Sequence, residues 1–573
     1  MNKLYLFSRV LLIGILLLLI GSGAHAQAPA WQTVVSSEQS GGNYAAAYAS
    51  AADNKGNIIV AGKFAGTVSF SGTTLTSAGA HDVFVAKWST VTAAFIWAQQ
   101  FGGSKQDDAS GLSVVGSSIY IVGAFSSPIS AFGTLTLTNS NSTGSEGFLV
   151  KVTDAGTSAN CVWAQRLSGS NNEEVTAVAA NGGHIYVTGS FTSPTVTIGN
   201  LTLTNAGGFD LYVAKYDDLG ADASLIWTQR AGGAQAERPT ALAVNGTSIY
   251  VGGCFGGNAS VFGNIVLASA GYSDAFVAKI TDMGNSAAFV WALQSGGRPG
   301  ASVGIDALDA TASGVYAAGA FVTSPIHGVT LGSNTLYGDS QSKAFVTKIS
   351  DAGTGAQFSW SWQTLGAGTS VISGLKVKGT NLYVAGKFAE SVNFGTTNYA
   401  SLGGLDDAFV ACLFDAGTNS GFAWAQRAGG FGYDAATALT LYGSRVYVVG
   451  YANPSAFFGS LTVNVPGAGN DELAFLAGLA DATVLGTARD IPLAGYIIFP
   501  NPAHNRATIQ LPAIPGTTTA TLTVLDALGR TLRTQPAALN AKAELDLAGL
   551  PAGLYAVRVQ AGGSTTTRRL VVE

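Results

Sequence analysis

The chain has 573 residues, a formal net charge of −5 and 11% charged residues, while glycine occupies 75 positions. A charged fraction below half of the ~25% typical of soluble domains, with no basic stripe, argues against nucleic acid as a partner. A single non-repetitive core seldom exceeds ~250 to 300 residues, so the chain must hold several domains or a repeat array.

Residues 1–26 have the pattern of a secretory signal peptide. A short basic start precedes an apolar run over 10–20, and a small-residue segment ends at Ala26. This order predicts cleavage between Ala26 and Gln27. The apolar run is much shorter than the ~20 residues that span a bilayer, and no other segment is long and apolar enough. We therefore expect an exported protein that is not an integral membrane protein.

Three series of short segments recur seven times each over most of the chain. An IYVxGxF-like series is represented by residues 119–125, and an AFVAK-like series by residues 275–279. These runs are β-branched and aromatic and are bounded by Gly, Asn, Asp or Ser, which indicates strands. The third series consists of tryptophans spaced 64 to 69 residues apart: Trp31, Trp97, Trp163, Trp227, Trp291, Trp360 and Trp424.

Each unit contains four strands in chain order, because another apolar run precedes every IYVxGxF strand. An extra segment between the second and third strands predicts a small hairpin at the edge of the sheet. Four-stranded sheets repeated radially are the blades of a β-propeller, which usually has 4 to 8 of them. The sequence therefore predicts an all-β fold in which residues 27–480 form a seven-bladed propeller.

The two ends of the array complement each other. The first tryptophan strand, 31–35, has no AFVAK strand before it, and the last such strand, 473–479, has no tryptophan strand after it. We predict that the N-terminal strand pairs with the last one, completes the final blade and closes the ring without leaving a bare edge.

The repeats resemble bacterial β-propeller repeats of the SBBP type. The closest match is Asp53-Asn-Lys-Gly-Asn-Ile-Ile-Val-Ala-Gly-Lys-Phe, and the resemblance covers about 31–480. Several units depart from the pattern, for example Val244-Asn-Gly-Thr-Ser-Ile-Tyr. The resemblance implies the propeller fold and export, and it implies no ligand.

A linker over 481–492 separates the repeats from residues 493–573, where seven short strands in about 80 residues predict a small Ig-like β-sandwich. The pieces FPNPAHNRATIQL, LTVLDALGRTL, AELDLAGLPAGLYAVRVQAGG and RRLVVE follow one another to the chain end. They resemble the type A C-terminal sorting domain of type IX secretion substrates. The resemblance implies passage across the outer membrane of a Gram-negative cell, through the periplasm, by the type IX secretion machinery, and then removal of the domain with release or surface attachment of the cargo. The alternative is an ordinary appended Ig-like module.

No residue pattern marks a reaction centre. The histidines are scattered, no G-x-S-x-G elbow is present, and Gly-Gly pairs such as Gly102-Gly103 are expected to be turns. Cys161, Cys254 and Cys412 occupy different positions in different repeats, which favours buried thiols over disulfides or a metal cluster. We expect neither enzymatic activity nor a cofactor.

One acidic pattern suggests a metal site. Counted back from the IYV strands, four carboxylates occupy one position in the loop that enters the innermost strand, while Ala47, Val303 and Ser370 or near neighbours stand there in the other units. In a closed ring the four could converge at one mouth of the channel and hold a cation or repel anions. The alternative is that each accepts backbone N–H bonds within its own loop. The four are Asp107, Glu173, Glu237 and Asp434.

The aromatic residues divide into a regular and an irregular set. The tryptophans could be platforms for sugars, but their regular recurrence favours packing between blades. Tyr44, Phe431 and Tyr433 lie in loops, break the regularity and are therefore the expected ligand contacts.

The sequence favours an exported binding or scaffold module at the cell surface or in the medium, with a polysaccharide or protein ligand. Two alternatives remain open: a propeller glycosidase or lyase that acts on extracellular polysaccharide, and a self-associating protein of the surface layer.

Overall fold

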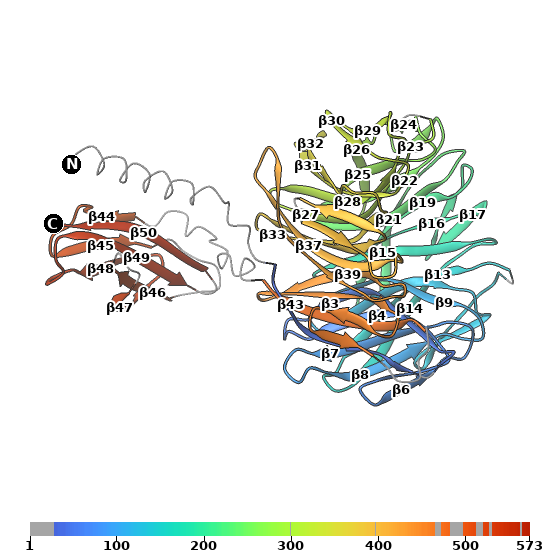
Figure 1. The fold of residues 1–573 in the computed structure, drawn as a ribbon, viewed down its shortest axis with the longest axis horizontal. Coiled ribbons are helices and arrows are strands. Elements are labelled where there is room, and N and C mark those ends of the chain that lie inside the picture. The colour runs from blue at the N-terminus through green and yellow to red at the C-terminus, as the bar shows by residue number, and fades with distance from the viewer. Residues whose placement is uncertain are drawn as a thin grey trace, which may run out of the picture. The chain divides into compact units, whose positions relative to one another are not determined.

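A computed structural model describes residues 28–39, 41–141, 143–297, 299–395, 397–464, 471–481, 497–511, 519–526, 530–561 and 564–573. The expected signal peptide and its cleavage site at Ala26 and Gln27 lie outside the described residues. The chain divides into two compact units, Met1–Asp481 and Ala482–Glu573 (Figure 1). Both consist of strands and loops, with no helix among the described residues, so this part of the chain offers no apolar helix that could cross a membrane.

The described part of the first unit contains seven antiparallel sheets with four main strands each, which we number in chain order; hairpin strands extend two of them to six strands. Sheet 1 is β3 (Tyr44–Ala52), β4 (Ile58–Ala65), β7 (Asp82–Ser89) and β8 (Ala94–Phe101). Sheet 2 is β9 (Asp107–Val115), β10 (Ser118–Phe125), β13 (Glu146–Asp154) and β14 (Ala159–Ser168). Sheet 3 is β15 (Glu173–Asn181), β16 (His184–Phe191), β19 (Asp210–Asp218) and β20 (Ala223–Gly232). Sheet 4 is β21 (Glu237–Asn245), β22 (Ser248–Phe255), β25 (Asp274–Asp282) and β26 (Ala287–Gln294). Sheet 5 is β27 (Ser302–Thr311), β28 (Gly314–Val322), β31 (Lys343–Asp351) and β32 (Ala356–Gln363). Sheet 6 is β33 (Ser370–Lys378), β34 (Asn381–Phe388), β37 (Asp407–Asp415) and β38 (Ser420–Ala428). Sheet 7 is β39 (Ala435–Tyr442), β40 (Arg445–Ala452), β43 (Leu473–Ala480) and β1 (Trp31–Ser36).

Within sheets 1 to 6 the four strands pair in chain order, as the sequence predicts. The first strand of every sheet carries a bulge where it passes the glycine of the IYVxG strand, for example opposite Gly123. A Cβ at this glycine would overlap the carbonyl oxygen of Asp108 on the neighbouring strand, and equivalent overlaps occur in all seven sheets. The repeated glycine is therefore required because the bulge brings two backbones too close for any side chain.

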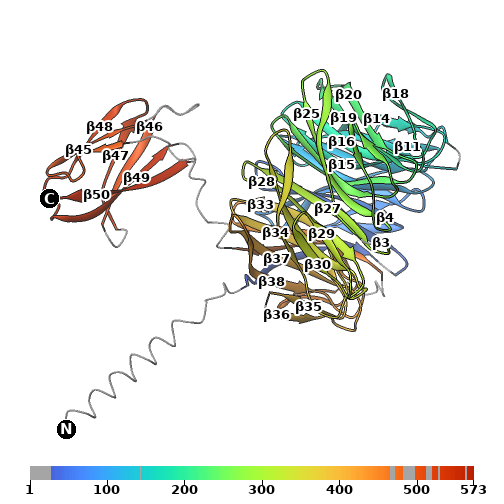
Figure 2. The same ribbon diagram turned by 90° about the horizontal axis from the view of Figure 1, so that it is seen from above.

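The predicted extra hairpins are present, but each lies along the outer strand of the preceding sheet. Backbone pairs join Gly102 to Ala131 and Gly429 to Phe457, and β17 pairs directly with β14. The hairpin β35–β36 pairs with the end of sheet 5 through Leu365 and Asn393, and it also lies near β38 of its own sheet 6, as Figure 2 shows. The hairpin strands are β5 (Thr67–Phe70), β6 (Thr73–Thr76), β11 (Ile129–Phe132), β12 (Leu135–Thr138), β17 (Thr195–Ile198), β18 (Leu201–Thr204), β23 (Ser260–Phe262), β24 (Ile265–Leu267), β29 (Gly328–Leu331), β30 (Asn334–Tyr337), β35 (Ser391–Phe394), β36 (Thr397–Ala400), β41 (Ala456–Phe458) and β42 (Leu461–Val463), with β2 (Glu38–Gln39) beside β5.

The first strands of the sheets contact one another in cyclic order: β3, β9, β15, β21, β27, β33, β39 and again β3. The expected pairing of the N-terminal strand occurs, because β1 runs antiparallel to β43 from Trp31 opposite Leu479 to Ser36 opposite Phe475. In Figure 1 the orange β43 accordingly lies beside the blue β3. The start and the end of the repeats therefore meet.

Hydrophobic side chains are buried between neighbouring sheets. One cluster joins Val85 and Trp97 of sheet 1 to Ile121 and Phe148 of sheet 2, and another joins Val60 of sheet 1 to residues of sheet 7. Because each sheet has apolar side chains on both faces, no sheet can bury its own surface alone. Stability therefore resides at the junctions.

A recurring polar contact crosses six of these junctions. An aspartate at the end of the third strand, or just after it in sheet 7, accepts hydrogen bonds from groups of the preceding sheet; we call it the junction aspartate. At Asp282, Lys215 Nζ lies 2.8 Å away, Trp227 Nε1 3.1 Å and the Tyr186 hydroxyl 2.7 Å. The six junction aspartates are Asp154, Asp218, Asp282, Asp351, Asp415 and Asp481.

The recurring tryptophans are therefore buried packing residues whose indole N–H binds the next sheet, apart from Trp31. Burial raises the pKa of Asp282, but the hydrogen bonds from Lys215, Tyr186 and Trp227 outweigh it, so the pKa lies below its usual range. The carboxylate is thus charged and fully paired at neutral pH.

The junction of sheets 7 and 1 lacks this contact. Gly478 stands where the lysine would be, and the Trp31 indole donates instead to the carbonyl of Arg427 at 3.3 Å. Sheet 6 shows an intermediate case, because Cys412 replaces the lysine while Trp424 still donates to Asp481 at 3.1 Å. The last junction therefore depends on the pairing of β1 with β43.

The second unit holds two antiparallel sheets among its described residues. One consists of β44 (Ile497–Phe499), β45 (Arg506–Gln510) and β48 (Lys542–Asp546), the other of β47 (Thr531–Ala538), β46 (Thr519–Leu525), β49 (Gly553–Ala561) and β50 (Ser564–Val572). Ile509 and Leu545 of the first sheet share an apolar cluster with Leu522 and Val557 of the second. The described residues of this unit form seven strands, of which β47 has mostly exposed side chains. The Ig-like topology stays a prediction.

We expect Lys215→Met to lower the free energy of unfolding by about 3 to 5 kcal/mol, because it leaves Asp282 buried without its cation. Lys55→Met, at an exposed loop position, should cost less than ~1 kcal/mol. Urea unfolding followed by tryptophan fluorescence at pH 7 measures both. Equal effects of the two substitutions would contradict the role of the junction contact.

We also expect a chain that starts at residue 37 to self-associate more than a chain that starts at residue 27, because removal of β1 leaves β43 as an unpaired edge. Size-exclusion chromatography of this variant and of a chain that starts at residue 27 measures the effect. A stable monomer without β1 would show that the pairing is dispensable.

Candidate functional site

One mouth of the space between the seven first strands holds a cavity of about 620 Å³. It lies where the first strands begin and the second strands end. Sheets 1, 2, 5, 6 and 7 contribute to its lining. We call six of its residues the mouth cluster: Tyr48, Lys63, Asp108, Asp306, Lys387 and Tyr451.

Two members of the mouth cluster depart from the repeat at its bulge. Five sheets place a small hydroxyl residue at the bulged position, where Ser110 and Thr437, for example, donate to backbone carbonyls across the junction. Sheets 1 and 5 place Tyr48 and Asp306 there instead. A bulge redirects its side chain, and bulges are frequent beside active sites. A Ser or Thr hydroxyl at this position can make the hydrogen bond across the junction. The presence of Tyr48 and Asp306 is therefore not explained by the packing of the sheets.

An aromatic group gathers on the sheet 1 side of the mouth. The hydroxyls of Tyr44 and Tyr48 lie 3.1 Å apart, and the ring of Tyr44 stacks on His81 with centroids separated by 5.6 Å. Lys63 Nζ lies 5.5 Å from the centroid of the Tyr48 ring. Tyr44, one of the expected ligand contacts, therefore lies next to the cavity and positions Tyr48.

Charged groups of both signs surround the cavity. Asp108 lies 3.7 Å from Lys63 Nζ and 3.8 Å from His81 Nδ1, distances that leave these pairs loosely held. Lys387 Nζ is 2.7 Å from Asp406. Such groups, half-buried in a concave site, are able to exchange their partners for those of a ligand.

The mouth shifts several ionisation equilibria. Burial raises the pKa of Asp306 to about 6, and burial also raises the pKa of Tyr48 and Tyr451. Burial, together with the charge of Lys63, lowers the pKa of His81. At neutral pH the site therefore offers phenol and imidazole groups without charge beside carboxylates and ammonium groups.

The four acidic residues of the sequence hypothesis are all buried, and each binds its own loop. Asp107 accepts from Gly103 N at 2.7 Å and from the hydroxyls of Ser127 and Ser130 at 2.7 and 2.9 Å. Asp434 accepts from Gly430 N at 2.7 Å. Glu173 bonds Ser193, and Glu237 bonds Gly233 N and Ser260 in the same manner.

These four carboxylates are therefore distributed over separate junctions. In the part of the chain that the structure describes, no three His, Cys, Asp or Glu side chains form a group that could hold a metal ion. The strand register also corrects one equivalence: the residue of sheet 1 at this position is Ala45, opposite Phe64, whereas Ala47 lies two residues further along the strand.

The other two expected ligand contacts lie away from the mouth cluster. Phe431 and Tyr433 are 72% and 52% exposed in the loop before β39, and neither lines the cavity. The sequence analysis missed all six members of the mouth cluster. Two of the six could have been found by aligning the repeats with one another. Tyr48 and Asp306 stand at a position that is Ser or Thr in the other five repeats.

Two other cavities occur in the first unit. One of about 540 Å³ at the opposite mouth is lined by the first strands of all seven sheets. The other, of about 820 Å³, lies between loops of sheets 3 and 4 around Arg238 and Tyr272. Neither unites ionisable side chains of as many sheets as the mouth cluster. All three cysteines are free thiols, and burial raises their pKa.

Comparison with known proteins identifies the tail. Residues 497–573 match the family model of the secretion system C-terminal sorting domain. The matched region excludes the repeats, so their resemblance to SBBP units stays a prediction. No curated protein matches the chain.

Two solved structures are similar over most of the chain. A protein of unknown function from Dyadobacter fermentans DSM 18053 is 12% identical, with a TM-score of 0.33, and the match covers 80% of this chain and 100% of that one. The endosialidase of phage phi92 is 9% identical, with a TM-score of 0.34, and the match covers 94% of this chain and 87% of that one. At these values neither likeness bears on function.

The domain match settles the destination of the protein. Its C-terminal residues 497–573 carry a secretion system sorting domain, and the protein is exported by type IX secretion to the cell surface or the extracellular space.

Proposed function

We propose that the exported protein is a closed seven-bladed β-propeller that binds a ligand at one mouth of its central channel without transforming it. The observation that carries this proposal is the mouth cluster, in which five sheets direct Tyr, Lys and Asp side chains into one cavity of about 620 Å³.

The cyclic contacts of the first strands and the pairing of β1 with β43 support the propeller architecture. The residues of the mouth cluster face a cavity and not a neighbouring sheet, so they are free of the packing demands that fix the junctions. Residues that break the repeat at this place, such as Tyr48 and Asp306, are then available for binding.

The chemistry of the mouth favours a saccharide. Tyrosine rings offer flat apolar faces, while Asp108, Asp306 and the lysines offer acceptors and donors for ring hydroxyls. The two charge signs nearly balance, so a strongly charged ligand would meet repulsion from one of them. A neutral or zwitterionic glycan of the extracellular space fits these groups best.

The runner-up function is glycoside cleavage, and one observation favours it. Asp306, with its pKa raised to about 6 by burial, has the property of a general acid, and Asp108 supplies a second carboxylate to the same cavity. Glycoside cleavage also requires a set distance between the two carboxyl groups, whereas binding makes no such demand. Binding without cleavage is therefore our proposal.

We expect Tyr48→Thr, which restores the residue type of the repeat, to weaken glycan binding at least ~10-fold while the fold stays intact. Purified full-length mature protein is incubated with a panel of extracellular polysaccharides, and both retention on the polymer and new reducing ends are measured. Thr176→Ser, at the same bulge in sheet 3, is the matched control and should bind as the wild type does. Release of reducing ends would replace the binding function with the enzymatic one, and unchanged retention in Tyr48→Thr would remove the mouth cluster as the site.

Asp306→Thr should also make stability less dependent on pH. Because burial raises the pKa of Asp306 to about 6, the folded state binds this proton more tightly than the unfolded chain, whose Asp titrates near ~3.9. The wild-type protein therefore loses stability as the pH rises from about 4 to 7, and Asp306→Thr removes that part of the loss. Urea midpoints of the two proteins at pH 5 and pH 8 measure the difference, and parallel pH profiles would contradict the assignment.

A further inference from the structure

Buried carboxyl groups meet in pairs at four junctions of the first unit. In each pair one acid begins the third strand of a sheet, and the other begins the first strand of the next sheet or, as Asp434 does, immediately precedes it. All eight side chains are at most 1% exposed. The pairs are Asp82 with Asp107, Glu146 with Glu173, Asp210 with Glu237, and Asp407 with Asp434.

Each pair includes one carboxylate oxygen that is buried and accepts no hydrogen bond. At the junction of sheets 1 and 2 this atom is Asp82 Oδ1. A Cβ added to Gly102 would lie 2.5 Å from Asp82 Oδ1 and 3.1 Å from Asp107 Oδ2, so both oxygens face the same small space. The corresponding atoms elsewhere are Glu173 Oε2, Asp210 Oδ1 and Asp407 Oδ1. A buried acceptor without a donor is costly, and its recurrence at equivalent junctions argues for a missing partner.

Three of the four pairs have an arginine of their own. Arg230 Nε lies 2.5 Å from Asp210, Arg166 Nη1 3.3 Å from Glu146, and Arg427 Nη1 3.7 Å from Asp407. At the junction of sheets 1 and 2, Gln100 occupies the arginine position and bonds the backbone of Thr76. Asp82 and Asp107 are therefore the one acidic pair of the described residues that has no arginine.

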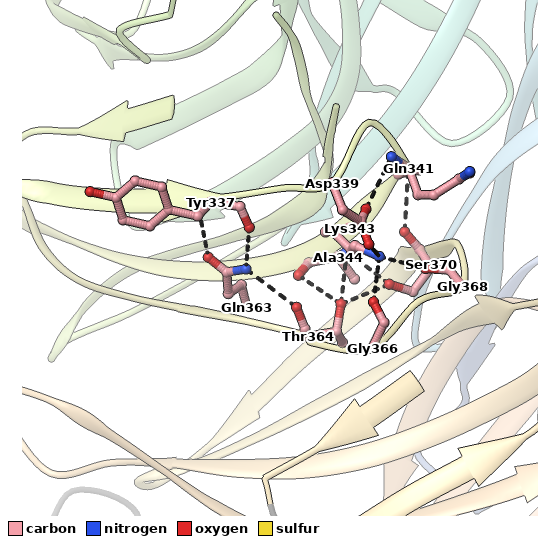
Figure 3. Close-up of polar contacts among 11 residues, drawn as sticks. Tyr337, Asp339, Gln341, Lys343, Ala344, Gln363, Thr364, Gly366, Gly368 and Ser370 are labelled. Carbon is pink, nitrogen blue, oxygen red and sulfur yellow. Dashed lines mark hydrogen bonds and ion pairs between the residues drawn. The ribbon is translucent and has the colours of Figure 1, made fainter. Parts of the chain in front are cut away.

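The junction of sheets 5 and 6 shows what this position accommodates. Lys343 stands where Asp82 stands in sheet 1, and Ser370 stands in place of Asp107. Figure 3 shows the Lys343 ammonium group among the carbonyls of Gly366 and Gly368, at 2.7 and 2.8 Å, with Asp339 at 2.9 Å. The ammonium group of Lys343 thus lies at a junction where neither acid of the pair is present.

Glycine stands at this position beside three of the four acidic pairs, as Gly102, Gly232 and Gly429, whereas Ser168 stands beside the fourth pair. Leu365, 56% exposed, replaces the residue equivalent to Gly102 where Lys343 replaces the acid. Gly102 adopts φ +152° and leaves room beside Asp82 that a side chain would fill. At the junction of sheets 1 and 2, the space that Gly102 leaves is therefore bordered by both carboxylates.

We propose that the junction of sheets 1 and 2 binds one divalent cation, of the calcium class, between Asp82 and Asp107. The two carboxylates, and the hydroxyls of Ser127 and Ser130 that donate to Asp107, are hard oxygen ligands of the kind that calcium prefers. The protein is exported, and calcium sites of extracellular proteins have Kd values of about 10⁻⁴ to 10⁻³ M. We therefore expect an affinity in this range. The bound cation links two neighbouring sheets.

The test is a calcium titration of the full-length mature protein after removal of metal with a chelator. We expect calorimetry to detect one site with a Kd of about 10⁻⁴ to 10⁻³ M, and we expect Tm to rise with calcium concentration above that value. Asp82→Asn, which preserves the shape of the side chain, should abolish both effects. Asp274→Asn is the matched control, since Asp274 occupies the same strand position at a junction whose second acid is replaced by Val303, and it should bind calcium as the wild type does.

A shared proton is the competing occupant, and its result would be different. Burial, with a smaller contribution from the charge of Asp107, raises the pKa of Asp82 to about 6. If a proton alone fills the space, calcium changes neither heat nor Tm of the wild type, stability falls as the pH rises from 5 to 8, and Asp82→Asn removes part of that fall. Such an outcome overturns the proposal, as does an equal rise of Tm by calcium in the wild type and in Asp82→Asn.

Discussion

The contact between a junction aspartate and the preceding sheet is the interaction on which the first unit depends. One carboxylate accepts from a lysine, a tryptophan indole and a tyrosine hydroxyl that lie on different strands. Replacing a buried ion pair by apolar residues often costs little stability. The main contribution of the junction contact is therefore to the orientation of the two sheets. Three donors from one sheet and one acceptor from the next fix the angle between the sheets, and the same angle repeated leads around a ring.

The junctions also explain why the repeat tolerates exceptions. Loss of the lysine at Cys412 leaves the tryptophan and tyrosine contacts to Asp481 intact. Loss of the whole contact between sheets 7 and 1 is offset by β1, whose strand pairing joins the two ends of the array. A repeat array of this kind distributes stability over its interfaces, so no single one must be complete.

The residues of the proposed binding site and those of the scaffold occupy different positions within the repeat. Residues that face a neighbouring sheet are repeated because every junction poses the same packing problem. Residues at the mouth face a cavity, so Tyr48 and Asp306 differ from their equivalents without disturbing the sheets. The acidic pairs share features of both groups of residues. They are buried at junctions, but the packing of the sheets does not require two carboxyl groups there. The sorting domain adds only the destination.

The sequence by itself determined the number of repeats, the order of strands in each sheet, the pairing of the two ends of the repeat array and the sorting tail. These features follow from local periodicity, from turn residues and from motifs contiguous along the chain. The tertiary structure alone decided that each hairpin crosses to the preceding sheet, that Asp107, Glu173, Glu237 and Asp434 each find a carboxylate of the neighbouring sheet, and that Tyr48 and Asp306 share one cavity although more than 250 residues separate them. The physical reason is that these contacts join residues of different repeats, and spacing along the chain does not specify which faces of two sheets meet.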